Sequence, residues 1–356
     1  MQVPADHVDQ VVAPVGQQAS SGTRRLVWAA GPWATLSWWA VAVGLAVGIA
    51  LPWLLLTLTG NNFLVQLSIS FLVFAIIAQC WNLVLGVAGV FSLAQLALYA
   101  VGGYTTAMLV IYLHWNPWVS ILMAPVMAGL AALIVGLPIL RLRGVYVALL
   151  TLGIQELLAN FLATGPDIFG HAFGLRVRGM GFPDWLGSDQ LMLYYYFGLI
   201  LFGITTLAVW WVMHSPIGMA ARAMRDSEVY AVSRGINIVR VKLFMFAFSA
   251  FFTGLAGAFM TQYQGLVSST ILNFDTLVAL VTMIVLGGWG TFWGPIAGAA
   301  LYVILNDWLL QPLGPGFQGL AFGLLLALIV VLAPKGLVGM VGKWAGNFFH
   351  VFREAE

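Results

Sequence analysis

Residues 63 to 86 read FLVQLSISFLVFAIIAQCWNLVLG, a run that contains no charged side chain. Roughly 20 consecutive apolar residues in a helix cross the hydrocarbon core of a bilayer, so this stretch predicts a membrane-spanning helix. Comparable runs recur along the chain of 356 residues. Together they predict ten spans, near residues 33 to 57, 63 to 86, 90 to 113, 117 to 140, 145 to 163, 191 to 213, 242 to 264, 273 to 288, 293 to 310 and 317 to 333.

The composition is typical of an integral membrane protein. Apolar residues make up 62% of the chain and charged residues 7%, against roughly 45 to 50% and about 25% in soluble domains. The predicted fold is therefore an all-α, polytopic bundle of transmembrane helices. The 14 Lys and Arg residues against 12 Asp and Glu give a net charge of +2, which excludes a large basic surface for nucleic acid.

The basic residues predict the orientation, because short cytoplasmic loops are enriched in Lys and Arg. With ten spans and both termini in the cytoplasm, 12 of the 14 bases face the cell interior: Arg24, Arg25, Arg141, Arg143, Arg222, Arg225, Arg234, Arg240, Lys242, Lys335, Lys343 and Arg353. Only Arg176 and Arg178 fall outside. Eight or nine spans remain possible if the stretch 90 to 113, or the pair separated by GGWGTFWGP at 287 to 295, is re-entrant.

The chain is expected to contain one large domain between two short tails. Residues 1 to 30 are polar and carry acids ahead of any base, unlike a cleaved signal peptide, and we expect a disordered cytoplasmic tail. Residues 31 to 340 form the transmembrane domain, with an external loop at 164 to 190. Residues 341 to 356 form a second cytoplasmic tail.

Motifs for chemistry are missing from the sequence. It has no P-loop, no G-x-S-x-G and no H-E-x-x-H among its five histidines, and Cys80 is the sole cysteine. We therefore expect a chain that is not an enzyme and holds no metal or cofactor. A rival class is an ion-coupled transporter or channel using Glu156 and Asp275 as a relay, but so few intramembrane ionisable residues weaken it.

Residues 214 to 242 form the longest polar interruption on the predicted cytoplasmic side, and we call this segment the inner loop. Ser215 and Pro216 are typical of a helix start, and Gly235 is placed to end the helix. Ile217, Ala221 and Met224 would share one face of it. One interpretation is a solvated loop. The alternative, which we favour, is a helix that docks a cytoplasmic partner, and an ATP-hydrolysing partner would supply what this chain lacks.

Four stretches resemble one known family: RLRGVYVALLTLGIQE at 141 to 156, SPIGMAARAMRDSEVYAVSRGI at 215 to 236, FSAFFTGLAGAF at 248 to 259 and VLGGWGTFWGPIAGA at 285 to 299. They are similar to the membrane permeases of bacterial ABC importers for branched-chain amino acids, a group that also serves urea and short-chain aliphatic amides. The resemblance runs from about residue 61 to 340. It implies a multi-pass protein of the bacterial cytoplasmic (inner) membrane that moves its cargo by alternating access.

The resemblance also implies partners. These are a second, homologous permease chain, an extracytoplasmic substrate-binding protein and two ATPase subunits, which would bind ATP and magnesium. It places eight residues in a coupling helix seated on the ATPase: Gly218, Arg222, Ala223, Arg225, Asp226, Ala231, Gly235 and Ile236. The stretches GVFSLAQLALYAVGGY at 89 to 104 and TGPDIFGHAFG at 164 to 174 depart from the usual pattern, which leaves the cargo open between an amino acid, urea and an amide.

Two further groups of residues are candidates for function. Polar residues within predicted spans could line a translocation path, or could bond to neighbouring helices instead: Ser92, Gln95, Tyr99, Tyr104, Thr151 and Glu156. Arg176 and Arg178 could orient the binding protein on the outer face, or could contact headgroups and nearby acids. The small residues Gly254, Gly257 and Gly298 are expected to serve close helix packing.

Overall fold

The computed structural model describes residues 62–142, 144–181 and 190–306, together with Gly48, Pro52, Gly323 and Leu324. The chain divides into residues 1–49 and residues 50–356, and every helix named below belongs to the second unit. Both predicted tails lie outside the described residues. So do the predicted spans near 33 to 57 and 317 to 333, except for those four isolated residues.

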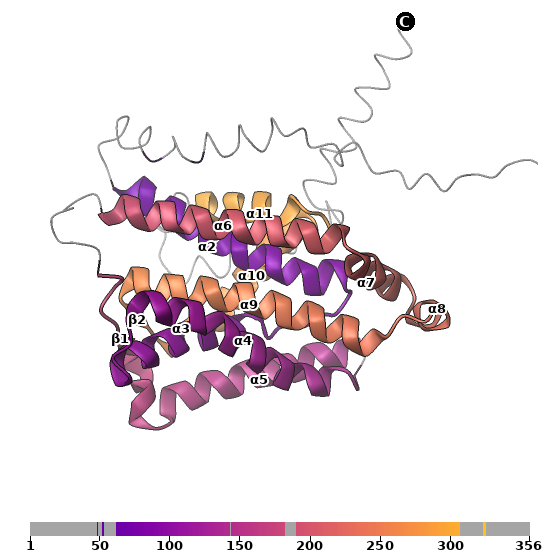
Figure 1. Ribbon diagram of the computed structural model, residues 1–356, viewed down its shortest axis with the longest axis horizontal. Helices are drawn as coiled ribbons and strands as arrows, with labels where there is room; N and C mark the ends of the chain where they lie inside the picture. Colours follow the sequence, from indigo (N-terminus) through magenta and orange to yellow (C-terminus); the bar gives the residue numbers. More distant parts are fainter. Residues whose placement is uncertain are drawn as a thin grey trace, which may run out of the picture. The chain divides into compact units, whose positions relative to one another are not determined.

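Six helices in the described ranges are long and apolar enough to cross a membrane (Figure 1). They are α2 (Phe63–Asn82), α3 (Gln95–Tyr112), α4 (Pro117–Ile139), α5 (Val145–Thr164), α6 (Gln190–His214) and α9 (Ile238–Gln264). Two apolar helices are shorter, α10 (Phe274–Gly287) and α11 (Gly294–Ile304). The described part is thus an all-α bundle of membrane-spanning helices, as the sequence predicts.

Backbone capping explains several helix ends. Asn116 accepts a hydrogen bond from the Trp118 N–H, and Pro117 occupies the first position of α4, where its missing N–H has no cost. Asn237 caps α9 in the same way through the Arg240 N–H, so that α9 begins four residues before the predicted position. Gly265 ends α9 in the left-handed region, with φ 66°.

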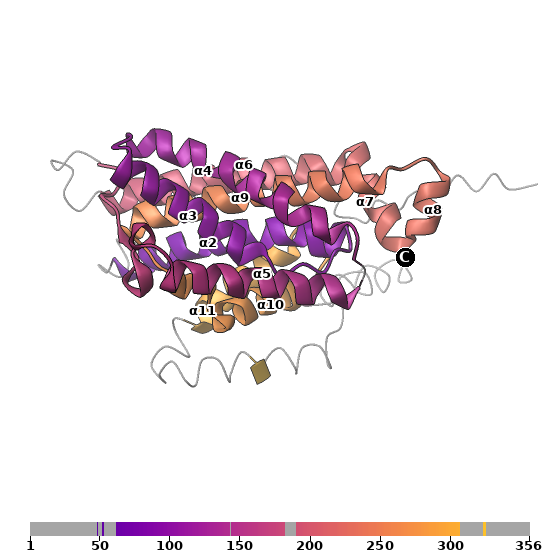
Figure 2. The same cartoon turned by 90° about the horizontal axis from the view of Figure 1, so that it is seen from below.

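The core of the bundle lies where α9 packs between α3 and α4, while α2 packs against α6 and α11 (Figures 1 and 2). The α3–α9 crossing is close because it uses glycines. A Cβ at Gly102 would collide with the Gly254 backbone, and one at Gly257 would collide with the Tyr99 carbonyl. Small residues allow such approach in membranes, where packing rather than the hydrophobic effect holds helices together.

The predicted span from 90 to 113 is shorter in the structure, because residues 88–94 leave the helical conformation before α3 begins. A π-helix, η1 (Leu83–Val87), precedes this segment. Side chains satisfy its backbone: Thr151 Oγ1 accepts from the Leu93 N–H at 2.9 Å, and the Trp81 indole donates to the Ser92 carbonyl at 2.7 Å. Irregular backbone at membrane depth requires such internal partners.

The outer loop, residues 164 to 190, contains two short 3-10 helices, η2 (Asp167–Phe169) and η3 (His171–Phe173), and the strand β1 (Leu175–Arg176). This strand pairs antiparallel with β2 (Leu266–Val267), just after α9, and η5 (Ser269–Leu272) follows. Figure 1 places the two-stranded sheet of β1 and β2 and the helices α7 and α8 of the inner loop at opposite ends of the bundle. That placement agrees with loops on opposite sides of a membrane.

Candidate functional site

The inner loop folds into two helices, α7 (Pro216–Asp226) and α8 (Glu228–Ser233). The Ser215 hydroxyl accepts from the Gly218 N–H at 3.3 Å, which confirms the predicted helix start. The prediction of one helix ending at Gly235 is wrong. The backbone becomes extended at Ser227, with φ −161°, and the hydroxyl of this residue caps a second helix by accepting from the Tyr230 N–H.

One side of the inner loop packs into the bundle. Ala221 and Met224 are buried, and Ile217 beside them is half-buried. Gly218 is buried as well, and a Cβ there would collide with the Val212 carbonyl. Ala231 of α8 is also fully buried. The apolar face of the loop therefore anchors it to its own chain and leaves the opposite face for other contacts.

The eight predicted coupling residues divide between these two sides. Gly218 and Ala231 are buried in this chain, so neither offers a side-chain surface to a partner. Half-buried positions are Arg222, Ala223 and Ile236, and exposed positions are Arg225, Asp226 and Gly235.

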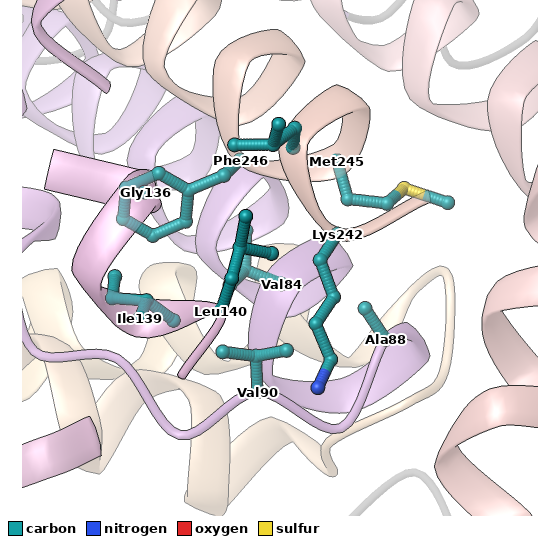
Figure 3. A pocket seen from close by; sticks show the side chains of 10 residues that line it. Val84, Ala88, Val90, Gly136, Ile139, Leu140, Lys242, Met245 and Phe246 are labelled. Carbon is teal, nitrogen blue, oxygen red and sulfur yellow. The ribbon is translucent and has the colours of Figure 1, made fainter. Parts of the chain in front are cut away.

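Charges hold the inner loop to the start of α9. Lys242 of α9 forms an ion pair with Glu228 of α8, and only 12% of the lysine side chain is exposed. Burial, and then the neighbouring charge of Arg225, lower the pKa of the Arg222 guanidinium. Figure 3 shows the Lys242 side chain extending toward Val90 and Ala88. An ion pair that is largely removed from water is costly to break, so it favours one position of α8.

A cavity of about 220 Å³ lies at the base of the inner loop. Its walls come from the irregular segment after η1, the connection from α4 to α5, and the two inner helices, and include Phe91, Leu142, Met224 and Lys242. A smaller hollow of about 10 Å³ adjoins the same lysine, between α4 and α9 (Figure 3). The inner loop is thus packed less tightly at its base than along its buried face.

Most of the predicted path residues are inside the bundle. The Gln95 amide donates to the Ser249 hydroxyl at 3.0 Å and to the Thr253 hydroxyl, and Ser249 donates to the Cys80 carbonyl at 2.8 Å. Ser92, Tyr99, Tyr104 and Thr151 are buried too. Gln95 thus connects α3 to α9, and Thr151 of α5 accepts from the Leu93 N–H, whereas the Ser92 hydroxyl accepts locally from the Ala94 N–H. The Tyr104 hydroxyl is buried with no hydrogen-bond partner among the described residues.

Glu156 is the exception, because it lies exposed on α5 while its neighbour Gln155 is buried. Gly153, Asn160 and Thr164 are exposed at helical spacing from it and form one row with it, which we call the α5 polar row. The Asn160 amide donates to the Glu156 carbonyl at 2.9 Å. The Glu156 carboxylate has no partner among the described residues. Ionisable groups inside spans are rare and costly, so Glu156 stays a candidate for a functional or a structural role.

At the other end of the bundle, Arg176 and Arg178 are both exposed on the outer loop. Phe173 beside them is 91% exposed. His171 lies 3.4 Å from Asp167 in the same loop. The geometry leaves both arginines accessible. Two further acids of the outer loop, Asp184 and Asp189, lie outside the described residues.

Sequence reasoning missed Asn82 and Gly290. The Asn82 amide donates to the Thr291 carbonyl at 2.8 Å, and its oxygen accepts from the Gly290 N–H at 2.7 Å. No signal in the sequence connects residues that are about 208 positions apart. Within the described ranges, no group of three or more His, Cys, Asp or Glu side chains is arranged to hold a metal.

Residues 63–334 match the family described as branched-chain amino acid transport system / permease component. The chain belongs to this family. It is 31% identical over 292 residues to the high-affinity branched-chain amino acid transport system permease protein LivM of Escherichia coli, covering 76% of this chain and 68% of that protein. It is 30% identical over 315 residues to the Salmonella typhimurium LivM, covering 82% and 73%. No solved structure matches the chain.

More distant permeases share the similarity. LivH of Escherichia coli is 23% identical over 294 residues, covering 75% of this chain and 91% of that protein. The ribose import permease protein RbsC of Haemophilus influenzae is 28% identical over 178 residues, about half of each chain. With six apolar helices of spanning length, this branched-chain amino acid permease component is a multi-pass protein of the inner membrane and a transport subunit.

Proposed function

We propose that this chain is the membrane subunit of an ATP-driven ABC importer and forms a translocation path for a branched-chain or related amino acid by alternating access. The observation that carries the proposal is the inner loop. Its buried face anchors it to the bundle, while its outer face remains free for a partner. The same machinery importing urea or a short-chain aliphatic amide is the alternative, and the names of the LivM and LivH relatives favour an amino acid.

The free face of the inner loop suits a protein partner. It exposes Met219, Val229, Tyr230 and Val232 beside charged side chains, and Val229 is 81% exposed. An amphipathic helix whose exposed apolar residues fit a groove is a common mode of protein recognition. Two ATPase subunits, each binding ATP and magnesium, would supply the energy and contact the residues Arg222, Ala223, Arg225, Asp226, Gly235 and Ile236.

The path is proposed to run between this chain and a second, homologous permease chain. The α5 polar row faces away from the interior of the bundle, and a carboxylate there would cost roughly 2.5 to 3.5 kcal/mol if it faced lipid. A second chain and a water-filled path would remove that cost. The occurrence of LivM and LivH among the relatives supports a pair of related permeases.

We propose the orientation from the charges, with ten spans, both termini in the cytoplasm and the outer loop outside. A substrate-binding protein would then dock on the outer face. Arg176 and Arg178 are both exposed there, and charged residues at the rim of an interface steer transient partners.

Uptake by the reconstituted importer tests the proposal. The chain is co-expressed with the proposed second permease chain and ATPase subunits, and the complex is purified. It is placed in proteoliposomes with ATP inside, and with labelled leucine and the binding protein outside. We expect leucine uptake that requires ATP. Uptake that continues without nucleotide would favour an ion-coupled transporter instead, and purification without any ATPase subunit would contradict the proposal. Competition by unlabelled leucine, urea and acetamide separates the two cargo classes.

A further inference from the structure

Besides the burial of its apolar side chains, the inner loop is joined to the bundle by a hydrogen bond from a charged side chain. The Arg225 guanidinium of α7 donates from Nη1 to the Gly86 carbonyl at 2.7 Å. It also bonds to Asp226 at 3.2 Å. Gly86 belongs to the π-helix η1, at the end of a membrane-spanning helix. A charged donor makes a stronger hydrogen bond than a neutral one, so this is a firm link to the spanning helix.

Gly86 in turn touches the glycine-rich loop between α10 and α11. A Cβ at Gly86 would collide with the Gly290 nitrogen and with the Asn82 side chain. Gly290 itself has φ 76°, and a Cβ there would lie 3.3 Å from Arg225 Nη1. The π-helix and this loop are therefore in direct contact, and the guanidinium lies against both at the edge of the cavity of about 220 Å³.

Asn82 of α2 also binds the loop between α10 and α11. It makes two hydrogen bonds to consecutive residues, accepting from the Gly290 N–H and donating to the Thr291 carbonyl. Thr291 also stiffens the loop, because its hydroxyl donates to the Gly288 carbonyl at 2.7 Å and accepts from the Gly294 N–H at 3.1 Å. Gly294 is the first residue of α11, so a shift of the loop is a shift of that helix.

We propose that Arg225, Gly86, Asn82, Gly290 and Thr291 form a relay that carries movement of the inner loop to α10 and α11. The proposal rests on the proposed function, because an ATPase must move the inner loop. Arg225 is then a positioning residue for transport, and it acts on the bundle instead of serving only the ATPase surface. Close-packed contacts of this kind pass small displacements on because they cannot absorb them.

Transport assays on the complete importer test the relay. Arg225→Gln keeps a polar side chain but removes the charge and shortens the side chain, so that the bond to the Gly86 carbonyl is lost. We expect leucine uptake to fall at least about five-fold, in the range of measured coupling effects, while ATP hydrolysis falls less, so that more ATP is used per leucine. Arg225→Lys keeps a charged donor and should recover part of the uptake. Arg240→Gln is the matched control, since it removes the same charge from an exposed position of the inner loop.

The second end of the relay has its own variant. Asn82→Asp preserves the shape and the acceptor for Gly290 but removes the donor to Thr291. We expect the same rise in ATP used per leucine. Because both changes interrupt one route, the double variant should reduce uptake little further than the more severe single change, whereas independent sites would combine their effects.

A distance measurement tests the relay without relying on uptake. Spin labels at Leu113→Cys and Trp289→Cys report on the loop, and labels at Leu113→Cys and Ser233→Cys report on the inner loop; all three positions are exposed, and the native Cys80 is buried. We expect a non-hydrolysed ATP analogue to change both distances in the otherwise unchanged complex. With Arg225→Gln, or with Asn82→Asp if that complex does not assemble, only the Ser233 distance should change.

Three results would each overturn the relay. In the first, the Trp289 distance responds to nucleotide equally well with and without the substitution. In the second, uptake and ATP hydrolysis fall in proportion. In the third, the two single effects multiply in the double variant. Failure of the proposed function would look different, because the unsubstituted complex would then show no ATP-dependent uptake at all.

Discussion

Helices α4 and α5 both expose a long face, but the two faces differ in chemistry. Every exposed residue of α4 is apolar: Trp118, Val119, Leu122, Met123, Val126, Met127, Leu130, Leu133, Ile134, Leu137 and Pro138. The exposed face of α5 contains apolar residues too, and in addition the α5 polar row with Glu156 at its centre. Length and mean hydropathy do not distinguish these helices as membrane spans.

The contrast shows that exposure in a single membrane chain has two meanings. An apolar face can be exposed to lipid at no cost in free energy, because hydrocarbon tails are as apolar as leucine. A face with a carboxylate, an amide and a hydroxyl is stable only where water or another protein supplies partners. We therefore expect α4 to contact lipid and α5 to contact the second permease chain and the path.

Thiol labelling gives the largest expected contrast. Gly153→Cys and Asn160→Cys on α5 should react with a membrane-impermeant, water-soluble thiol reagent in the assembled importer, whereas Val126→Cys and Leu130→Cys on α4 should not. The reactive thiolate forms in water but not in hydrocarbon. Mass spectrometry of the labelled chain measures the result. Background is low because Cys80 is fully buried. Equal labelling of the two helices would remove the basis of the comparison.

Placing a carboxylate on α4 should destabilise the protein. Leu130 lies near the middle of α4 and is 51% exposed, so Leu130→Glu should cost roughly 2.5 to 3.5 kcal/mol. The check is the fraction of folded protein recovered in nanodiscs and its thermal midpoint, compared with Leu130→Met as the control. A variant as stable as the parent would mean that this face of α4 meets water or protein.

Removing the carboxylate from α5 should have the opposite effect on stability and a cost in transport. Glu156→Leu should leave the folded fraction of the isolated chain unchanged or higher, because without the second chain the carboxylate is costly in lipid. Leucine uptake should fall about ten-fold, which corresponds to roughly 1.4 kcal/mol. Glu156→Gln separates charge from hydrogen bonding. If Glu156→Leu lowered stability and left uptake intact, the residue would have a structural role.

The smallest effect is expected one turn further along α5. Asn160 donates to the Glu156 carbonyl, so its side chain is partly occupied within the helix. Asn160→Leu should reduce uptake less than Glu156→Leu does, and Asn160→Gln should reduce it less again. The same proteoliposome assay ranks the three variants. A larger loss at Asn160 than at Glu156 would move the centre of the α5 polar row toward the outer end of the helix.

Local signals predicted the helices well, and long-range partners could not be predicted. The bounds of α4 and α5 agree with the sequence within one residue, because apolar runs and caps are properties of neighbouring residues. The interior position of Gln95 depends on Ser249 and Thr253, which are more than 150 positions away. The two exposed faces could not be separated either, because α4 and α5 are both apolar along most of their length.

The break at Ser227 shows a subtler limit. The stretch AARAMRDSEVYAVS favours a helix throughout, so that composition alone predicts one element. Serine is compatible with the interior of a helix, but its hydroxyl can also cap the start of a new one. Ser227 does the latter, because its hydroxyl accepts from the Tyr230 N–H at the start of α8. Ala231 is buried, so α8 packs back on the bundle after the break, and the local sequence does not reveal that contact.

The glycine contacts between α3 and α9 restrict how this molecule can change shape. Backbone touches backbone at Gly102, so neither helix can slide or roll without separating from the other. Helices α3 and α9 therefore form one rigid unit. We expect the α3–α9 pair to move as one rigid body in the proposed transport cycle, so that any change in shape occurs at its boundaries, for example in the irregular stretch 88–94 that precedes α3.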